Sequence, residues 1–123
     1  MKIMIVDDHS GIREMLRSLL ACPGIELSEC ADGAEALGAY HDFRPDWVFM
    51  DVEMGDNDGL TATREICNAY PEARVVIVTK HSGEAMREAA SDAGACAYVL
   101  KENLLDLREL LTVKTQTLNL NET

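Results

Sequence analysis

The sequence contains no apolar segment long enough to cross a membrane and no secretory signal. Its apolar runs stay below about 18 residues, the length that a membrane-spanning helix needs. The N-terminus passes from Met1-Lys2 directly into the apolar run at Ile3, without the basic, apolar and small-residue succession of a signal peptide. We therefore expect a cytoplasmic protein that does not act on a membrane.

The sequence also lacks a cysteine pattern for a metal site or a disulfide framework. No C-x-x-C pair occurs among the four cysteines, and the histidines are not spaced with them as zinc ligands would be. A chain that is 47% hydrophobic can build a core without cross-links. We expect reduced and mostly buried thiols at Cys22, Cys30, Cys67 and Cys96.

Basic residues are scarce. The chain has 11 lysines and arginines against 22 aspartates and glutamates, which gives a formal net charge of −11. Direct binding to nucleic acid is therefore not expected, because a phosphate backbone requires a basic patch. The acidity is compatible with a divalent cation or a basic protein partner.

Strand-like and helix-like segments alternate five times along a length that fits one domain. The predicted strands cover residues 2–6, 25–30, 46–51, 74–78 and 96–100, and the predicted helices cover 11–21, 34–42, 59–69, 83–92 and 103–112. This alternation predicts an α/β fold, with an open and mostly parallel sheet, helices on both faces and right-handed crossovers.

Capping residues and apolar spacing predict the ends and inner faces of these helices. Ser10 or a neighbour, Asp58, Ser82 and Asn103 are placed to begin helices, and Gly94 is placed to end one. Helical spacing predicts inward-facing residues, which are Ile12, Met15, Leu16, Leu19 and Leu20 in the first helix, Ala34, Leu37 and either Tyr40 or His41 in the second, and Leu104, Leu107 and Leu111 in the fifth, with Leu105 and Leu110 at its borders.

Four of the predicted strands end in polar residues. The run Trp47-Val48-Phe49-Met50, apolar throughout like a strand buried on both faces, ends at Asp51. The first strand runs into Asp7-Asp8, the fourth into Thr79 and the fifth into Lys101. Parallel strands present their carboxyl ends at one edge of a sheet, where ligands of open α/β folds bind. We therefore expect these polar residues to converge on one site.

Carboxylates, an ammonium group and a hydroxyl in one place suit the transfer of a phosphoryl group. Converging carboxylates resist ionisation unless a cation lies among them, and oxygen ligands favour Mg²⁺. Lys101 and Thr79 would supply a positive charge and a hydroxyl to the phosphoryl oxygens. No serine or cysteine lies at the centre, so Asp51 is the candidate nucleophile, and its attack on phosphorus gives an acyl phosphate.

Each of these residues has an ordinary explanation when it is taken alone. Asp7-Asp8 could cap the first helix, Thr79 could simply end a strand, and Lys101 could be a solvated surface lysine. The presence of suitable groups at all four strand ends favours a site over four separate explanations.

The strand ends and their surroundings form a set of motifs that covers nearly the whole chain. They are Val6-Asp7-Asp8-His9, Ala31-Asp32-Gly33-Ala34-Glu35-Ala36-Leu37, Pro45-Asp46-Trp47-Val48-Phe49-Met50-Asp51, Asp58-Gly59, Thr79, and Gly94-Ala95-Cys96-Ala97-Tyr98-Val99-Leu100-Lys101. As a set, they resemble the receiver domains of two-component response regulators over residues 1–112. The first motif and His81 lean toward CheY-like receivers of the NarL/LuxR type.

The resemblance implies a flavodoxin-like (βα)5 fold, a three-layer sandwich with five parallel strands in the order 2-1-3-4-5. Asp51 would accept a phosphoryl group from a sensor histidine kinase or a phosphotransfer protein, and Thr79 and Lys101 would contact the phosphoryl oxygens. The chain would catalyse only its own phosphorylation and dephosphorylation, and would otherwise not be an enzyme. Residues 113–123 would be a polar C-terminal tail or a truncated linker.

The same resemblance implies a metal site and a switch. Mg²⁺, or Mn²⁺, would be bound by Asp8, Asp51 and the backbone carbonyl of Glu53 directly, and by Asp7 through water. Tyr98 would turn inward when Thr79 is drawn to the phosphoryl group, changing the surface of the fourth helix, last strand and fifth helix for a downstream effector or a homodimer. A plain edge-strand aromatic packed on a helix is the alternative for Tyr98.

The chain departs from the family pattern in the loops around the site. Gly55 stands where receivers usually have proline, which would loosen that loop. Lys80 follows Thr79, where a small residue is usual, and either hinders access to Asp51 or points to solvent or a site carboxylate. Glu53 and His81 occupy positions that modulate dephosphorylation in the family.

Two other function classes stay open from the sequence. A degenerate receiver could keep the fold as a phosphorylation-independent interaction module, although the intact acidic, threonine and lysine set argues against it. A phosphatase or flavin carrier on the same fold would need a D-x-D motif or a Ser/Thr/Gly-rich phosphate loop after the first strand. The sequence has Asp7-Asp8-His9 there instead.

Overall fold

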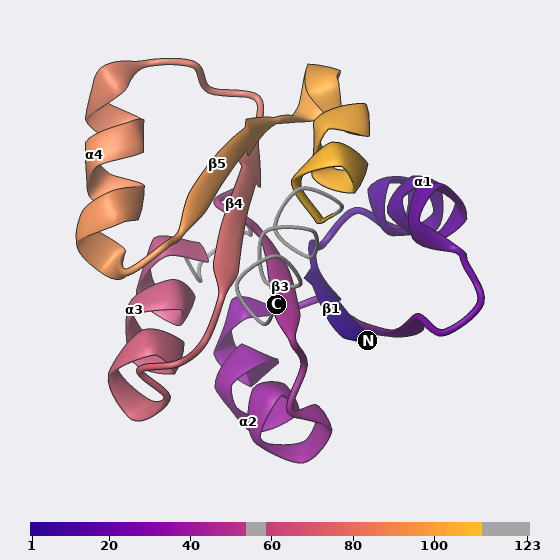
Figure 1. Ribbon diagram of the computed structural model, residues 1–123. Coiled ribbons are helices and arrows are strands. Elements are labelled where there is room, and N and C mark those ends of the chain that lie inside the picture. Colours follow the sequence, from indigo (N-terminus) through magenta and orange to yellow (C-terminus); the bar gives the residue numbers. More distant parts are fainter. Residues whose placement is uncertain (54–58, 112–123) are drawn as a thin grey trace, which may run out of the picture.

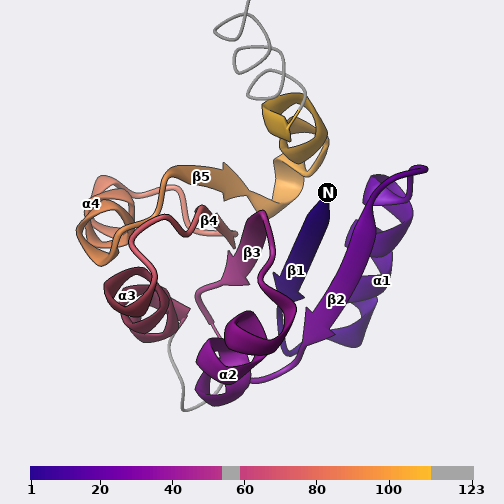
Figure 2. The same cartoon turned by 60° about the horizontal axis from the view of Figure 1, so that its bottom comes forward.

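The structure is a computed structural model that describes residues 1–53 and 59–111. Its centre is one parallel five-stranded sheet in the predicted order, β2-β1-β3-β4-β5 (Figures 1 and 2). The strands are β1 (Lys2–Val6), β2 (Glu26–Cys30), β3 (Trp47–Asp51), β4 (Val75–Thr79) and β5 (Ala97–Leu100). The chain moves from β1 to β2 on one side and continues with β3 on the other. The carboxyl ends of β1 and β3 therefore flank the point where strand order reverses.

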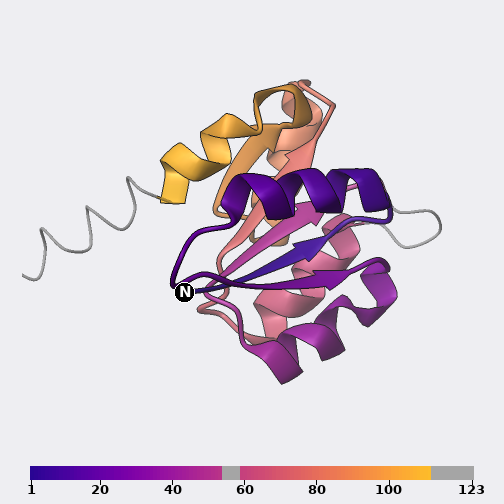
Figure 3. The same cartoon turned by 90° about the vertical axis from the view of Figure 1, so that its right-hand side faces the viewer.

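Helices cover both faces of the sheet, which confirms the three-layer prediction (Figure 3). They are α1 (Ser10–Leu20), α2 (Gly33–Phe43), α3 (Gly59–Ala69), α4 (Glu84–Ala93), the short 3₁₀ turn η1 (Lys101–Asn103) and a last helix over residues 105–111. The first and last of these pack on one face, and α2, α3 and α4 pack on the other. Within the described residues, no helix is long and apolar enough to span a membrane.

The two central strands, β3 and β4, are buried along their whole length. Successive side chains of a strand point to opposite faces, so each central strand feeds two cores. Trp47 and Phe49 of β3 pack with α1 and the last helix, whereas Val48 and Met50 pack with α2, α3 and α4. The prediction that the run before Asp51 is buried on both faces is confirmed.

Two predictions about helix faces are wrong, because Met15 of α1 is 54% exposed and Ala34 of α2 is also exposed. Leu105, which was predicted at the border of the inner stripe of the last helix, is 67% exposed. In each helix the buried stripe is narrower than the apolar pattern. Leu16 and Leu20 carry the contact of α1 with the sheet, and Ala36 and Tyr40 carry that of α2. Met15, Leu105 and Ala34 lie outside these buried stripes and are exposed to solvent.

The predicted helix ends are partly confirmed. Gly94 ends α4 in the left-handed region, with φ of 109°, and its N–H group bonds to the last carbonyls of the helix, as a glycine cap does. Ser82 is not the cap of α4, because Gly83 occupies that position without a side-chain hydrogen bond. His9, the neighbour of Ser10, occupies the cap position of α1. Asn103 closes the 3₁₀ turn η1 before the last helix.

Asp58 and Gly55 lie outside the described residues, as does the predicted tail at 113–123. All four cysteines lie inside the described part, and none of them forms a disulfide. Cys30 is buried and Cys67 is half-buried, but Cys22 and Cys96 are exposed. The prediction of mostly buried thiols is thus wrong for two of the four, because both of these lie in connections between elements.

Candidate functional site

The polar residues predicted to converge do follow strands at one edge of the sheet. Asp7 follows β1, Asp51 ends β3, Thr79 ends β4 and Lys101 follows β5. In the register of the sheet, Asp51 lies opposite Val78, so Thr79 stands one residue farther along the neighbouring strand. Asp7, Asp51 and Thr79 are all buried. These three side chains therefore belong to the buried centre of the fold.

A close backbone approach fixes the end of β3. Gly59, the first residue of α3, lies so near the strand that an added Cβ atom would stand 1.9 Å from the carbonyl oxygen of Asp51. The Gly59 N–H group donates a hydrogen bond of 3.1 Å to the carbonyl of Val52. Only glycine fits here, because any side chain would push the helix away from the strand. This contact holds the backbone that presents the Asp51 carboxylate.

Lys101 joins the two buried carboxylates. Its Nζ atom lies 3.1 Å from Oδ1 of Asp51 and 3.3 Å from Oδ2 of Asp7. Burial by itself lowers the pKa of Lys101, but the carboxylates of Asp51 and Asp7 outweigh burial, so the pKa is raised and the amine stays charged. The strand ends of β1, β3 and β5 are thereby tied by one ammonium group.

Asp51 presents one anchored oxygen and one open oxygen. Oδ1 accepts from Lys101 and, at 3.3 Å, from the backbone N–H of Glu53. Oδ2 is buried and has no hydrogen-bond partner among the described residues, although Asp51 is only 2% exposed. Burial, and after it the charge of Asp7, raises the pKa of the Asp51 carboxyl. An unpartnered buried oxygen is costly, so this atom points to a ligand that would satisfy it.

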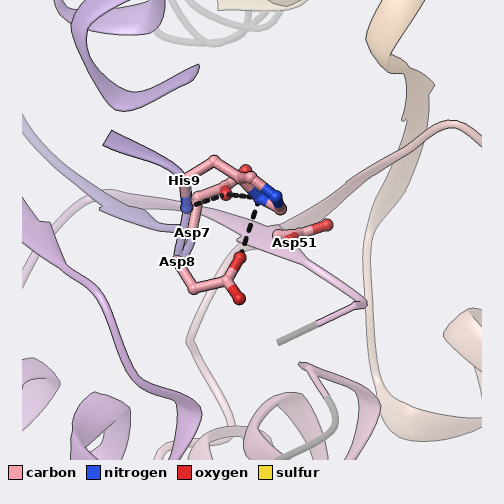
Figure 4. A group of neighbouring side chains, drawn as sticks. All are labelled: Asp7, Asp8, His9 and Asp51. Atoms are coloured by element: carbon pink, nitrogen blue, oxygen red, sulfur yellow. Dashed lines mark hydrogen bonds and ion pairs between the residues drawn. The ribbon is translucent and has the colours of Figure 1, made fainter. Parts of the chain in front are cut away.

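Four side chains form a cluster that could hold a metal ion (Figure 4). Ligand atoms of Asp7, Asp8, His9 and Asp51 all lie within 4.8 Å of one another. Three of the four residues supply carboxylate oxygens, the donors that Mg²⁺ prefers, and Asp51 also carries the buried oxygen that has no partner among the described residues. The residues present therefore fit a divalent cation.

His9 is the member of the cluster that the sequence analysis did not assign to the site. Its Nδ1 atom lies 2.8 Å from Oδ1 of Asp8 and 3.3 Å from Oδ1 of Asp7. Its backbone N–H donates to the same Asp7 oxygen at 2.8 Å. The only sequence signal was adjacency to the two aspartates, and adjacency alone does not fix the direction of a side chain.

An arginine on α1 supports the loop that carries these groups. Arg13 donates from Nη1 to the backbone carbonyl of Asp7 at 2.6 Å and from Nε to Glu29 of β2 at 3.1 Å. Glu29 also accepts from Arg17 at 2.8 Å. This network was not predicted, because it depends on how α1 lies against β2 and has no local sequence pattern.

Thr79 connects to the loop that follows it. Its Oγ1 atom accepts a hydrogen bond of 3.3 Å from the backbone N–H of His81. The ring of His81 contacts the carboxylate of Glu53, and this hydrogen bond lowers the pKa of Glu53. Lys80 extends toward Glu53 as well, with Nζ 3.7 Å from Oε2, and its side chain is 70% exposed. Two of the alternatives predicted for Lys80 therefore hold together: its side chain is exposed to solvent, and it pairs with a carboxylate beside the site.

Tyr98 of β5 contacts the same loop. Its hydroxyl donates to the backbone carbonyl of His81, and the guanidinium of Arg87 lies 4.6 Å from the centre of its ring. Burial raises the pKa of the Tyr98 hydroxyl. Tyr98 therefore links β5 and α4 to the segment that begins at Thr79.

A family model describes this chain. The model of the response regulator receiver domain matches residues 3–113. The chain belongs to the response regulator receiver domain family. Response regulator receiver domains belong to two-component signalling systems. The matches of this receiver include both CheY proteins and regulators of the LuxR type.

Individual relatives give the same result. The receiver is 34% identical to the chemotaxis protein CheY of Bacillus subtilis over 96% of this chain and 98% of CheY. It is 38% identical to the uncharacterised transcriptional regulatory protein YhcZ of B. subtilis, over 83% of this chain. The chain spans about half the length of that regulator, 49%. It also matches the structure of a LuxR-family response regulator from Aurantimonas sp. SI85-9A1, with a TM-score of 0.85, 37% identity, and coverage of 91% of this chain and 82% of that chain.

Proposed function

We propose that Asp51 is the phosphoryl acceptor of this receiver and that a sensor histidine kinase or a phosphotransfer protein is the donor. A carboxylate oxygen of Asp51 attacks the phosphorus of a phosphohistidine. The new O–P bond forms as the P–N bond breaks, which leaves an acyl phosphate on Asp51 and returns the electron pair to the imidazole of the donor. The open buried oxygen of Asp51, beside an oxygen anchored by Lys101, is the observation that carries this proposal.

The neighbouring groups suit the charge of the transferring phosphoryl group. Lys101 can move from Asp51 and Asp7 to the phosphoryl oxygens, because its ammonium is charged and its stem is flexible. Thr79 supplies a hydroxyl from the adjacent strand.

Asp7, Asp8, Asp51 and the carbonyl of Glu53 are the residues that would hold Mg²⁺, or Mn²⁺. The cation would neutralise the facing oxygens of donor and acceptor when bound. The clustering of the three carboxylates and the unpartnered oxygen of Asp51 support this assignment.

A change at Thr79 would be passed to α4 and β5 through one loop. If the hydroxyl of Thr79 turns to the phosphoryl group, the hydrogen bond from His81 N–H breaks. The carbonyl of His81 is held by Tyr98, and Tyr98 packs under Arg87 of α4. The surface formed by α4, β5 and the last helix would then shift for a downstream effector or a second copy of the chain. Glu53, Lys80 and His81 would modulate the lifetime of the phosphoryl group.

The test is the mass of the protein after incubation with acetyl phosphate and Mg²⁺. We expect the wild-type chain to gain one phosphoryl group, and the Asp51→Ala variant to gain none. Addition of EDTA should prevent the gain in the wild type. An unmodified wild-type chain, or equal modification of Asp51→Ala, would overturn the proposal and would favour an interaction module that works without phosphorylation.

A further inference from the structure

We infer that His9 adds a nitrogen ligand to the acidic site and gives it a preference for borderline transition-metal ions, such as Co²⁺, Ni²⁺ and Zn²⁺, over Mg²⁺. This inference rests on the proposed cation site and concerns which ions that site selects. Imidazole is a good ligand for these ions, whereas carboxylate, carbonyl and water oxygens suit Mg²⁺ and Mn²⁺. A site with an available imidazole therefore differs in selectivity from a site of oxygens alone.

The spacing of the ligand atoms supports a shared ion. Two ligands about 2.1 Å from an octahedral ion, and at right angles to each other, lie about 3.0 Å apart. Nδ1 of His9 lies 2.8 Å from Oδ1 of Asp8 and 3.3 Å from Oδ1 of Asp7, which brackets that spacing (Figure 4). The same distances also fit hydrogen bonds from an Nδ1–H group to the carboxylates. Metal selectivity therefore distinguishes a ligand role of His9 from a role in hydrogen bonding alone.

The position of His9 is fixed by its own backbone. Its N–H group donates to Asp7 at 2.8 Å, which keeps the residue folded over the carboxylates. Its side chain is 65% exposed, so an ion can reach the ring without opening the core. Asp51 supplies an independent sign of a ligand, because one oxygen of its buried carboxylate has no partner within the described chain and Asp51 contributes a ligand atom to the same cluster.

The experiment compares the dissociation constants of Mg²⁺ and Co²⁺, measured by calorimetry with the wild type and with His9→Phe. Phenylalanine keeps a planar ring and removes the ligand nitrogen. The ratio of the Mg²⁺ constant to the Co²⁺ constant should fall about tenfold in His9→Phe, since even the outer-shell partners of metal ligands are worth about 10- to 100-fold in affinity. The matched control is His41→Phe, which removes an exposed imidazole from α2 and should leave the ratio unchanged.

Two further variants keep the outcomes separate. Asp51→Asn should weaken both ions, which shows that they share one site. If Mg²⁺ binds the wild type and is weakened by Asp51→Asn while the ratio is unchanged in His9→Phe, the inference fails and the proposed function stands. If neither ion binds the wild type, both fail. Co²⁺ binding that is unaffected by Asp51→Asn would place the ion on surface histidines and would also overturn the inference.

A measurement on the unaltered chain avoids dependence on how His9→Phe folds. Zn²⁺ added to protein with ¹⁵N-labelled histidine should shift a ring nitrogen of His9 strongly, with the rings of His41 and His81 moving less. Unchanged ring nitrogens of His9 at saturating Zn²⁺ would contradict the inference.

Discussion

The edge of the sheet at the amino ends of the strands and the edge at their carboxyl ends differ in the partners of their charged groups. At the amino-terminal edge, Lys2 donates two hydrogen bonds. Its backbone N–H donates to the carboxylate of Asp46 at 2.8 Å, and its Nζ donates to the carbonyl of Phe43 at 3.3 Å. The guanidinium of Arg74 lies 4.8 Å from the ring centre of Trp47. At the carboxyl-terminal edge, two carboxylates are buried beside a single ammonium group, and one of their oxygens has no partner in the described chain.

We therefore expect the amino-terminal edge to contribute to stability, whereas the carboxyl-terminal edge keeps buried charges that cost stability. Proteins keep unfavourable buried charges mainly where chemistry needs them. At the amino-terminal edge, the carboxylate of Asp46 accepts from a backbone N–H group, the ammonium of Lys2 donates to a backbone carbonyl, and the guanidinium of Arg74 lies over an aromatic ring. Substitutions at the two edges should therefore differ in their effects on stability, and the following predictions compare them.

The largest effect should follow removal of the bridging ammonium. Lys101→Met leaves Asp7 and Asp51 buried together without a cation, so we expect a loss of about 3 kcal/mol in the free energy of unfolding, measured with urea in EDTA at neutral pH. Millimolar Mg²⁺ should restore part of the loss, because it replaces the missing charge. A loss below about 1 kcal/mol would show that the bridge does not hold the strand ends together.

Removal of the charge of Asp51 should raise the free energy of unfolding, in contrast to the loss expected for Lys101→Met. Because burial and Asp7 raise the pKa of Asp51, its ionised form destabilises the folded state, and Asp51→Asn should stabilise the metal-free protein by about 1 kcal/mol at pH 7. The folded protein binds the Asp51 proton more tightly than the unfolded chain. The gap between wild type and variant should therefore close as the pH falls through the folded pKa.

The matched control for that prediction lies at the other edge. Asp46→Asn also replaces an aspartate next to β3, but the carboxylate of Asp46 is exposed and accepts a hydrogen bond from the backbone N–H of Lys2. It should therefore give no stabilisation at pH 7. Equal stabilisation by both substitutions would mean that general relief of negative charge, and not the burial of Asp51, is the cause.

A smaller loss is expected from the amino-terminal edge itself. Arg74→Met removes the cation from the face of Trp47 and should cost about 0.5–1 kcal/mol in urea unfolding. The yield of phosphorylation by acetyl phosphate should not change, because the contact lies at the far end of β3 and β4. A lower yield would show that the two edges are coupled and would weaken the comparison.

The smallest effect should come from Lys80. Its exposed side chain pairs with Glu53 beside the site, and exposed ion pairs of this kind contribute little to stability. We expect Lys80→Ala to be phosphorylated about twofold faster by acetyl phosphate with Mg²⁺, because access to Asp51 is less hindered. Equal rates for the two proteins would remove Lys80 as a modulator.

The sequence predicted the strands and the edge at which polar groups meet, whereas the strand order was implied by the resemblance to receiver domains. The strands and the edge follow from two simple facts. A continuous apolar run is needed where a parallel strand is covered on both faces, and parallel strands deliver their last residues to one edge. Asp51 and Lys101 are therefore found without any knowledge of their contacts. The left-handed turn at Gly94 is local in the same sense, and its prediction is confirmed.

The remainder depends on contacts that no local pattern contains. The sequence did not predict that Arg13 supports the carbonyl of Asp7, because this contact depends on how α1 lies beside β2. It also did not predict that His9 turns toward Asp8, because adjacency in the chain does not fix the direction of a side chain. The exposure of Met15 and Leu105 has a related cause. Apolar spacing gives the direction of a helix face, but the neighbouring elements decide how wide the buried stripe is.

The most direct test of the phosphoryl-acceptor site uses beryllofluoride, which mimics a phosphoryl group on a carboxylate. Fluorine NMR of the wild-type chain with beryllofluoride and Mg²⁺ should show bound fluoride resonances that disappear in Asp51→Asn and when EDTA removes the cation. Bound resonances that persist in Asp51→Asn, or their absence from the wild type, would contradict the assignment of Asp51 as the acceptor at the carboxyl-terminal edge.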